Sequence, residues 1–126
     1  MPPLLFVYGT LRSECKNPYA RLLRAHATWL GRARVPGRLY RLWGYPAMRG
    51  SRHPEEWVAG ELYLLRDPSG LFPLLDRYEG RHHYARLRVR ATLEGGRKAM
   101  AWAYQWRWNL PESRRIALRG LATWRP

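Results

Sequence analysis

The sequence contains a single cysteine and no long run of apolar residues. Cys15 has no partner cysteine among the 126 residues, so a disulfide within the chain is excluded. A single, unpaired cysteine fits a protein of a reducing compartment. The apolar run from Leu4 to Tyr8 is shorter than the core of a signal peptide. No segment approaches the roughly 20 apolar residues that cross a bilayer. We therefore expect a cytoplasmic protein with no membrane partner.

Lysine and the acidic residues are also scarce. Lys16 and Lys98 are the only lysines among 23 basic residues, and Asp and Glu together number nine, which leaves a formal net charge of +14. An excess of arginine suits partners that carry phosphate or carboxylate groups, such as nucleic acid or an anionic metabolite. The arginines are spread along the whole chain, however. This favours a genome that encodes Arg where others use Lys over a dedicated nucleic-acid surface.

The residue spacings of common metal and nucleotide sites are absent. Cysteine and histidine do not cluster at zinc spacing, and the adjacent His82 and His83 would point in opposite directions from a strand. The glycines form neither a phosphate-binding loop nor a dinucleotide fingerprint. Ser13 lacks a nucleophile-elbow context, and we interpret Cys15 as an incidental thiol. We expect no metal and no organic cofactor.

The hydrophobic pattern predicts several short strands and two helices in a single domain over residues 1–126. One helix is expected within 19–29, after Asn17-Pro18, where Leu22, Leu23, His26 and Leu30 recur at roughly helical spacing. A second is expected from Asp67-Pro68 to Gly80, because Asp caps a helix start and Gly ends a helix. Strands are expected at 4–8, 38–43, 57–65, 84–93 and after Gly95-Gly96, with a turn at 36–37, a loop at 51–56 and a short helix within 110–126. This mixture predicts an α+β fold with a strongly curved sheet or small barrel.

The strand predicted at 84–93 has one apolar face and one arginine-rich face. Tyr84, Arg86, Arg88 and Arg90 share the second face. Beside the aromatic residues of the next strand, these arginines would imitate a surface on which bases stack. Their stems could equally cover apolar neighbours on a solvated face. A pocket on this face would favour metabolite chemistry, whereas a flat, open surface would favour nucleic-acid binding.

The acidic residues leave few candidates for catalysis. Five are expected to be solvated in loops or at the ends of elements: Glu14, Glu55, Glu56, Glu94 and Glu112. Asp67 has a capping role and Glu61 lies within a strand. Asp76 and Glu79 share a face at the end of the second helix, where the helix dipole disfavours the charged form of a carboxylate. Glu79 is therefore a candidate acid/base with a raised pKa, although an exposed glutamate that ends a surface helix explains the local sequence at least as well.

Several short patterns occur in an order that is typical of one protein family. Tyr8-Gly9-Thr10-Leu11 is similar to a YGTL loop, and Leu75–Gly80 is similar to an L-D-x-x-E-G signature. Further matching segments are Gly37-Arg38-Leu39-Tyr40, Tyr45-Pro46-Ala47, Val58–Tyr63 and Tyr84-Ala85-Arg86. Together they resemble the γ-glutamyl cyclotransferase-like (AIG2-like) family over residues 4–106. The stretch Arg81-His82-His83 is shorter than in many relatives, and the tail after Trp108 matches no motif.

The resemblance implies the fold, the reaction and the site. The fold would be a small mixed barrel with a few short helices. The α-amine of a γ-glutamyl group would attack its own γ-carbonyl and release 5-oxoproline and an amine or amino acid, without a cofactor. The residues implied are Glu79 as the catalytic acid/base, and Tyr8, Gly9, Thr10, Leu11, Tyr84 and Tyr104 as substrate-binding residues. The YGTL spelling leans towards the γ-glutamylamine branch rather than the glutathione-degrading one.

Three functions are therefore open. The first is a cyclotransferase acting on a γ-glutamyl amine, dipeptide or ε-(γ-glutamyl)lysine. The second is an enzyme with the same site and a different γ-glutamyl substrate, such as a biosynthetic intermediate. The third is a non-catalytic module of the same fold that binds nucleic acid through its arginines. Glu79 argues against the third, because binding alone does not need this residue.

Overall fold

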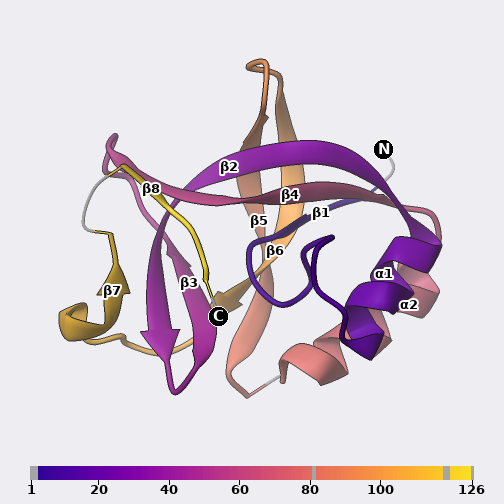
Figure 1. The fold of residues 1–126 in the computed structure, drawn as a ribbon, viewed down its shortest axis with the longest axis horizontal. Helices are drawn as coiled ribbons and strands as arrows, with labels where there is room; N and C mark the ends of the chain where they lie inside the picture. Colours follow the sequence, from indigo (N-terminus) through magenta and orange to yellow (C-terminus); the bar gives the residue numbers. More distant parts are fainter. Residues whose placement is uncertain (1–2, 81, 118–119, 126) are drawn as a thin grey trace.

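The computed structural model describes residues 3–80, 82–117 and 120–125, and five of its strands close into a barrel (Figure 1). The barrel strands are β1 (Leu4–Val7), β2 (Ala27–Leu42), β4 (Glu56–Leu65), β5 (Tyr84–Leu93) and β6 (Lys98–Trp106). The ring closes because β2 pairs with both β4 and β5, while β6 and β1 complete the circle. Outside the ring, β3 (Tyr45–Gly50) and β7 (Arg115–Ile116) pair with β2, and β8 (Gly120–Ala122) pairs with β4. The expected α+β barrel is confirmed.

Buried apolar residues form two cores, one on each face of the barrel wall. Strand alternation sends Phe6 inward, where it packs with Leu62, whereas Leu5 and Val7 point outward against the helices. The outer core also holds Leu75. A strand that is buried on both faces reads as a continuous apolar run, which explains the unbroken run in β1.

Two helices cover the outer core, and their ends follow the capping signals. The side chain of Asn17 caps α1 (Pro18–His26), and that of Asp67 caps α2 (Pro68–Glu79) by accepting from the Gly70 N–H at 3.2 Å. Gly80 ends α2 with a φ of 87°. The two helices lie together on one side of the barrel, opposite β7 and β8 (Figure 1). None of the helices in the described ranges is long and apolar enough to cross a membrane.

Strand β2 differs most from the expectation. The turn expected at Pro36-Gly37 is wrong, because β2 continues through both residues and Pro36 pairs with Trp57 of β4. Proline removes only one donor from this ladder, and 16 residues of β2 share the pairing among several neighbours. The chain reverses instead at Trp43-Gly44, a two-residue turn between paired Leu42 and Tyr45.

The start of β4 and the C-terminal segment also differ from the expectations. Glu56 is not a solvated loop residue: it begins β4 with only 6% of its surface exposed. Its carboxylate accepts from Arg38 Nε at 2.9 Å and from an Arg115 guanidinium nitrogen at 2.7 Å. The short helix expected within 110–126 is a 3-10 turn at Glu112–Arg114, and residues 118, 119 and 126 of that range lie outside the described part of the chain.

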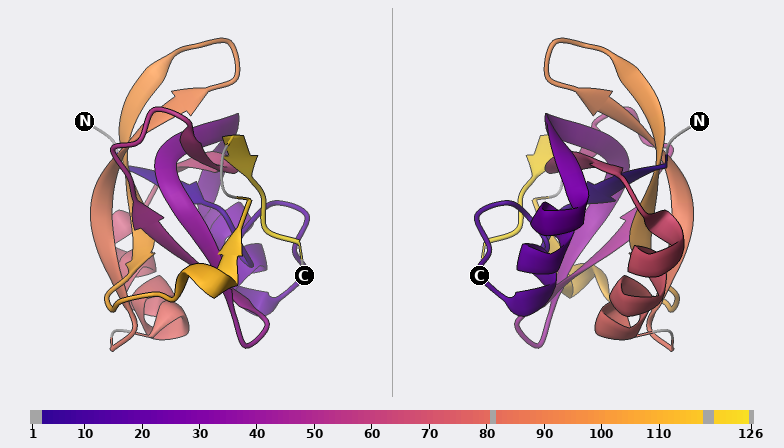
Figure 2. Two further views of the ribbon diagram at one scale, coloured as in Figure 1. Left: turned by 90° about the vertical axis from the view of Figure 1, so that its left-hand side faces the viewer. Right: turned by 90° about the vertical axis from the view of Figure 1, so that its right-hand side faces the viewer.

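Three chain segments from different parts of the sequence meet at one end of the molecule. The C-terminal end of α2, the start of β5 and the β2–β3 turn all lie at the lower end in both orientations (Figures 1 and 2). The β5–β6 turn lies at the opposite end. This arrangement places Glu79, the last residue of α2, beside the first residues of β3 and β5.

Candidate active site

A cavity of about 290 Å³ opens at the end of the barrel where α2 terminates. Its walls come from the loop after β1, the start of β3 and the connection from α2 to β5. The described lining residues are Tyr8, Gly9, Thr10, Tyr45, Pro46, Tyr78, Glu79, His83 and Tyr84. The cavity therefore unites the two most characteristic sequence motifs, which are about 70 residues apart in the chain.

The loop after β1 is held so that its backbone faces the cavity. A Cβ atom on Gly9 would lie 2.5 Å from Cγ of Pro46, so only glycine allows the loop to approach β3 this closely. Arg12 Nε donates to the Gly9 carbonyl at 3.1 Å, and the Asn17 amide donates to the Thr10 carbonyl at 2.6 Å. Within the described ranges, no protein oxygen accepts from the N–H groups of Gly9, Thr10 or Leu11. These donors are available to a ligand.

Two further contacts fix the position of this loop. Glu61 of β4 accepts from the Ser13 N–H at 2.6 Å and from the Ser13 hydroxyl at 2.7 Å. A guanidinium nitrogen of Arg12 donates to the Trp124 carbonyl at 2.8 Å. Glu61 is thus an anchor for the loop, and the loop does not need a ligand to hold its shape.

Glu79 stands in this cavity without a partner. Its carboxylate makes no hydrogen bond or ion pair with the residues that the structure describes. Burial raises its pKa to about 8, because the ionised form loses solvation. A carboxyl group with this pKa exchanges its proton near neutral pH, which suits general acid–base catalysis.

Tyrosines surround the carboxyl group and are themselves positioned by hydrogen bonds. Tyr8 donates to the Tyr104 carbonyl at 2.6 Å, Tyr84 donates to the Pro46 carbonyl, and the Tyr78 and Thr10 hydroxyls lie 2.6 Å apart. Burial, together with the nearby Glu79 carboxyl, raises the pKa of both Tyr8 and Tyr84. These phenols therefore stay protonated and act as fixed walls and donors.

The sequence-based site residues fall into two groups. Tyr8, Gly9, Thr10, Glu79 and Tyr84 line the cavity together. The Leu11 side chain is buried in the outer core and does not line the cavity, so only its backbone could contact a ligand. The Tyr104 side chain is outside the described lining: its hydroxyl donates to Asp76 at 2.7 Å, and only its carbonyl reaches Tyr8.

Four lining residues were assigned no role from the sequence. Tyr45 and Pro46 belong to a motif that was recognised, but their proximity to Glu79 depends on the β2–β3 turn. Tyr78 precedes the candidate catalytic residue and occupies an unspecified position of the L-D-x-x-E-G signature. His83 lies in the short stretch that departs from the family pattern, in which Arg81 is outside the described residues.

The arginine-rich face of β5 is divided between the cavity and the packing of α2. Tyr84 needs no bulge to reach the cavity, because the β5–β6 register is unbroken and this end of the face lines it. Arg86 donates to Asp76 of α2 at 2.7 Å and stacks on the Phe72 ring at 3.8 Å. Arg86 is therefore tied to α2 and is not free to contact a phosphate backbone.

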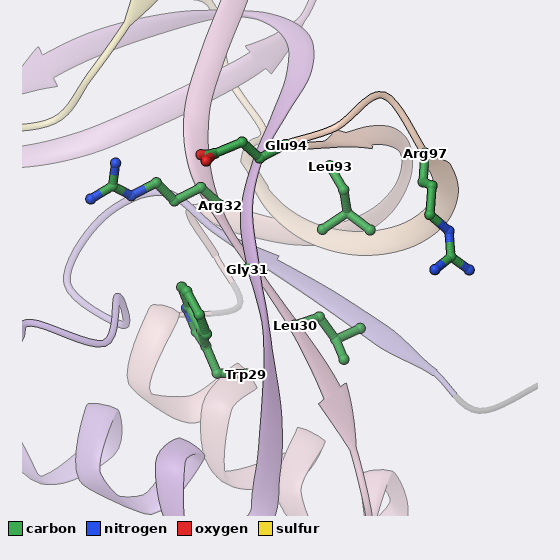
Figure 3. Close-up of a pocket in the computed structure, with 7 residues that line it drawn as sticks. All are labelled: Trp29, Leu30, Gly31, Arg32, Leu93, Glu94 and Arg97. Carbon is green, nitrogen blue, oxygen red and sulfur yellow. The ribbon is translucent and has the colours of Figure 1, made fainter.

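A second depression, of about 460 Å³, lies between β2 and the β5–β6 turn (Figure 3). Arg32 and Arg97 extend away from each other there, and Glu94 is exposed. It contains neither a desolvated titratable group nor a set of backbone donors, and we do not assign catalysis to it. In the described ranges, no three His, Cys, Asp or Glu side chains cluster as metal ligands.

Residues 5–125 match the sequence model of a family described as gamma-glutamyl cyclotransferase, AIG2-like. An AIG2-like protein from Mus musculus is 23% identical with a TM-score of 0.70, and the match covers 88% of this chain and 81% of the mouse chain. YkqA from Bacillus subtilis is 26% identical with a TM-score of 0.69 over 92% of this chain and 38% of YkqA. An uncharacterised protein from Pyrococcus horikoshii is 23% identical with a TM-score of 0.65 over 90% of this chain and 85% of that chain. No curated protein matches the sequence significantly.

Proposed function

We propose that this chain, which belongs to the gamma-glutamyl cyclotransferase, AIG2-like family, cleaves a γ-glutamyl amide and releases 5-oxoproline. The observation that carries the proposal is the desolvated Glu79 carboxyl beside the N–H groups of Gly9 and Thr10, for none of which the described residues provide a hydrogen-bonding partner. Acyl transfer needs both a proton acceptor and donors for a developing oxyanion. The cavity offers both within one enclosed space.

The first step would join the substrate's α-nitrogen to its own γ-carbonyl carbon. A free α-amino group has a pKa of about 7.7–8.0, so much of it is protonated at neutral pH. Glu79, with a pKa of about 8, is matched to take that proton. The new C–N bond closes a five-membered ring, and the negative charge that develops on the γ-oxygen would be stabilised by the backbone N–H donors of the loop.

The second step would break the bond to the leaving nitrogen. The ring nitrogen loses a second proton as the lactam forms. The tetrahedral intermediate collapses, the γ-carbonyl re-forms, and Glu79 passes the two protons in turn to the departing nitrogen, which leaves as an ammonium ion. Glu79 thus ends in its starting state, and no other reactant is consumed. The tyrosine walls would hold the glutamyl chain in its ring-closing conformation, which converts a flexible chain into a near-attack geometry.

The substrate's α-carboxylate needs donors, and arginine is a common partner of carboxylates in proteins. No arginine is among the described residues that line the cavity. Tyr8 and Tyr84 already donate their protons to backbone carbonyls. The donors at hand are the loop N–H groups and the paired hydroxyls of Thr10 and Tyr78, which lie 2.6 Å apart and keep one proton to donate. We propose that the carboxylate is bound by these neutral donors.

The leaving group separates the branches of the family. We propose a γ-glutamylamine substrate on the strength of the YGTL loop, with γ-glutamyl dipeptides and glutathione as the competing classes. We propose a cytoplasmic location, since the single Cys15 fits a reducing compartment. We do not propose nucleic-acid binding, because Arg86 is engaged by Asp76 and Phe72.

The test is an assay for 5-oxoproline with purified protein and a panel of γ-glutamyl amines, γ-glutamyl dipeptides and glutathione. Glu79→Gln keeps the size of the side chain but removes the exchangeable proton, and we expect kcat to fall by about 10²–10⁴-fold. Glu14→Gln is the matched control, because Glu14 is an exposed glutamate outside the cavity. Activity that survives Glu79→Gln, or a folded protein that releases 5-oxoproline from no panel member, would overturn the proposal.

A further inference from the structure

The turn between β2 and β3 presents an exposed aromatic residue next to the cavity. Trp43 is 75% exposed, and its ring centroid lies 6.2 Å from that of Tyr45. Tyr45 is itself part of the cavity wall and is partly exposed. The pair therefore continues the wall of the cavity outward to the surface.

The backbone conformation at Trp43 is unfavourable for a bulky residue. Its φ is 45° and that of Gly44 is 89°, so both residues of the turn are left-handed. Asn, Asp and Gly adopt such turns readily, whereas a bulky residue with a positive φ is an outlier. The exposed ring contributes little to the core. Backbone strain and an exposed indole at the same residue indicate a role other than folding.

The described walls of the cavity suit a planar, uncharged group. Glu79 is the only acidic residue among them, and neither lysine nor arginine is present there. His83, also in the wall, stacks on Trp106 with centroids 5.4 Å apart and rings nearly parallel. Among the described walls, an aliphatic cation would find no second carboxylate, and an anion would find no lysine or arginine. An aromatic ring, in contrast, would find faces against which to stack.

We propose that Trp43 and Tyr45 bind the leaving group, and that the preferred substrates are γ-glutamyl amides of amines that carry an aromatic ring, such as benzylamine. The inference rests on the proposed function, because it concerns the second product of that reaction. It goes beyond it by naming the chemical class of the amine. Aromatic pairs of this kind contribute about 3- to 10-fold in binding beyond the burial of area.

The first experiment compares two γ-glutamyl amides of similar size, the benzylamide and the cyclohexylmethylamide. Both leaving groups are apolar, and only the first is planar. Trp43→Asn should lower kcat/KM for the benzylamide by about 3- to 10-fold and that for the cyclohexylmethylamide by about twofold or less. Comparing variant with wild type for each substrate cancels the different basicities of the two amines.

The variant carries its own folding control. Asn-Gly is a preferred pair for a two-residue turn with two positive φ angles, so Trp43→Asn should unfold at a temperature no lower than that of the wild type. Trp29→Ala is the matched surface control: Trp29 is 49% exposed and lies in the depression of Figure 3. This control should change neither kcat/KM value. Equal losses for both amides in Trp43→Asn would overturn the inference.

A binding measurement separates the two proposals. Glutaric acid monobenzylamide and its cyclohexylmethyl counterpart lack the α-amine and cannot cyclise, so calorimetry reports their affinity alone. We expect the aromatic analogue to bind more tightly, and Trp43→Asn to abolish the difference. Absence of 5-oxoproline from every amide would overturn the proposed function. Equal affinity of the two analogues for the wild-type protein would overturn the aromatic preference, whatever the turnover assay gives.

Discussion

The Glu79 carboxyl destabilises the folded protein whenever it is ionised. Its pKa rises from an ordinary 4.5 to about 8 on folding, because burial removes water from the charged form. The folded state therefore holds a proton between pH 4.5 and 8 that the unfolded state has lost. The contribution of Glu79 to the free energy of unfolding therefore falls as pH rises through this window, and it is constant below and above the window.

We therefore expect Glu79→Gln to unfold less readily than the wild type at alkaline pH. A shift of this size corresponds to at most about 5 kcal/mol, and residual solvation of the half-buried side chain lowers the expected gain to about 2–3 kcal/mol. The gain should appear between pH 4.5 and 8 and vanish below pH 4.5. Denaturant unfolding at pH 4, 6 and 8.5 measures it, and a pH-independent difference would contradict the desolvation of the carboxyl.

Single residues also mark where sequence reasoning succeeds. Glu79 and Tyr8 were predicted as site residues through short motifs, and the structure places both in one cavity. His83 and Tyr45 could not be placed from the sequence, because each reaches the cavity through the relative positions of two elements. Glu56 was misjudged, since the arginines that stabilise its buried charge come from distant strands.

At the scale of elements, α2 is held in place by a cluster just before its C-terminal end. Asp76, three residues before Glu79, accepts from Arg86 Nε of β5 at 2.7 Å and from the Tyr104 hydroxyl of β6 at 2.7 Å. The final turn of α2 is thus fixed to the barrel wall from two strands. Asp76 is a positioning residue in this arrangement, because it orients the turn that carries Glu79 and does not line the cavity.

Asp76→Asn should loosen that turn. We expect the free energy of unfolding to fall by about 1.5–2 kcal/mol, since a hydrogen bond to a charged group is replaced by a weaker one. We also expect a lower kcat for 5-oxoproline release, with the substrate KM changed less. Arg88→Ala is the control on the same face, because Arg88 is exposed and contacts only the Trp102 ring among the described side chains. A kcat that is unchanged in Asp76→Asn would contradict the positioning role.

Elements that are encoded by neighbouring residues were predicted well, and those that depend on long-range pairing were not. Helix α2 and strands β1 and β5 were confirmed to within a residue or two of their expected bounds, because a capping residue and strict alternation are encoded in adjacent positions. Helix α1 ends earlier than expected, at His26, and residues 27–29 belong to β2. The first half of β2 was missed. Pro36-Gly37 gives a local turn signal, and pairing with both β4 and β5 overrides it.

At the scale of the whole molecule, a buried carboxylate connects parts of the chain that are far apart. Glu56 accepts from Ser51, Arg38 and Arg115, and so joins the start of β4 to β2 and to β7. These bonds, led by that from the Ser51 hydroxyl, lower the pKa of Glu56 to about 2. A carboxyl group whose pKa falls on folding stabilises the fold above its unfolded pKa near 4.5, and this contribution is lost as pH falls towards 2.

Glu56→Gln should therefore destabilise the protein at neutral pH. The expected loss is about 1.5–3 kcal/mol at pH 7, because hydrogen bonds to a charged acceptor are replaced by bonds to a neutral amide. The difference from the wild type should shrink between pH 4.5 and 2, where the natural carboxylate is itself protonated. Thermal unfolding across that range tests the sign, and a difference that grows with acidity would contradict the lowered pKa.

The bond from Arg12 to the Trp124 carbonyl has a consequence for the order in which the protein matures. It joins positions that are 112 residues apart, and the same arginine holds the Gly9 carbonyl. The Gly9 loop leaves the ribosome early. The hydrogen bond from Arg12 to Trp124 cannot form until Trp124 has also left the exit tunnel. The substrate cavity is therefore among the last parts of the protein to become competent, although its first residues are among the earliest to be synthesised.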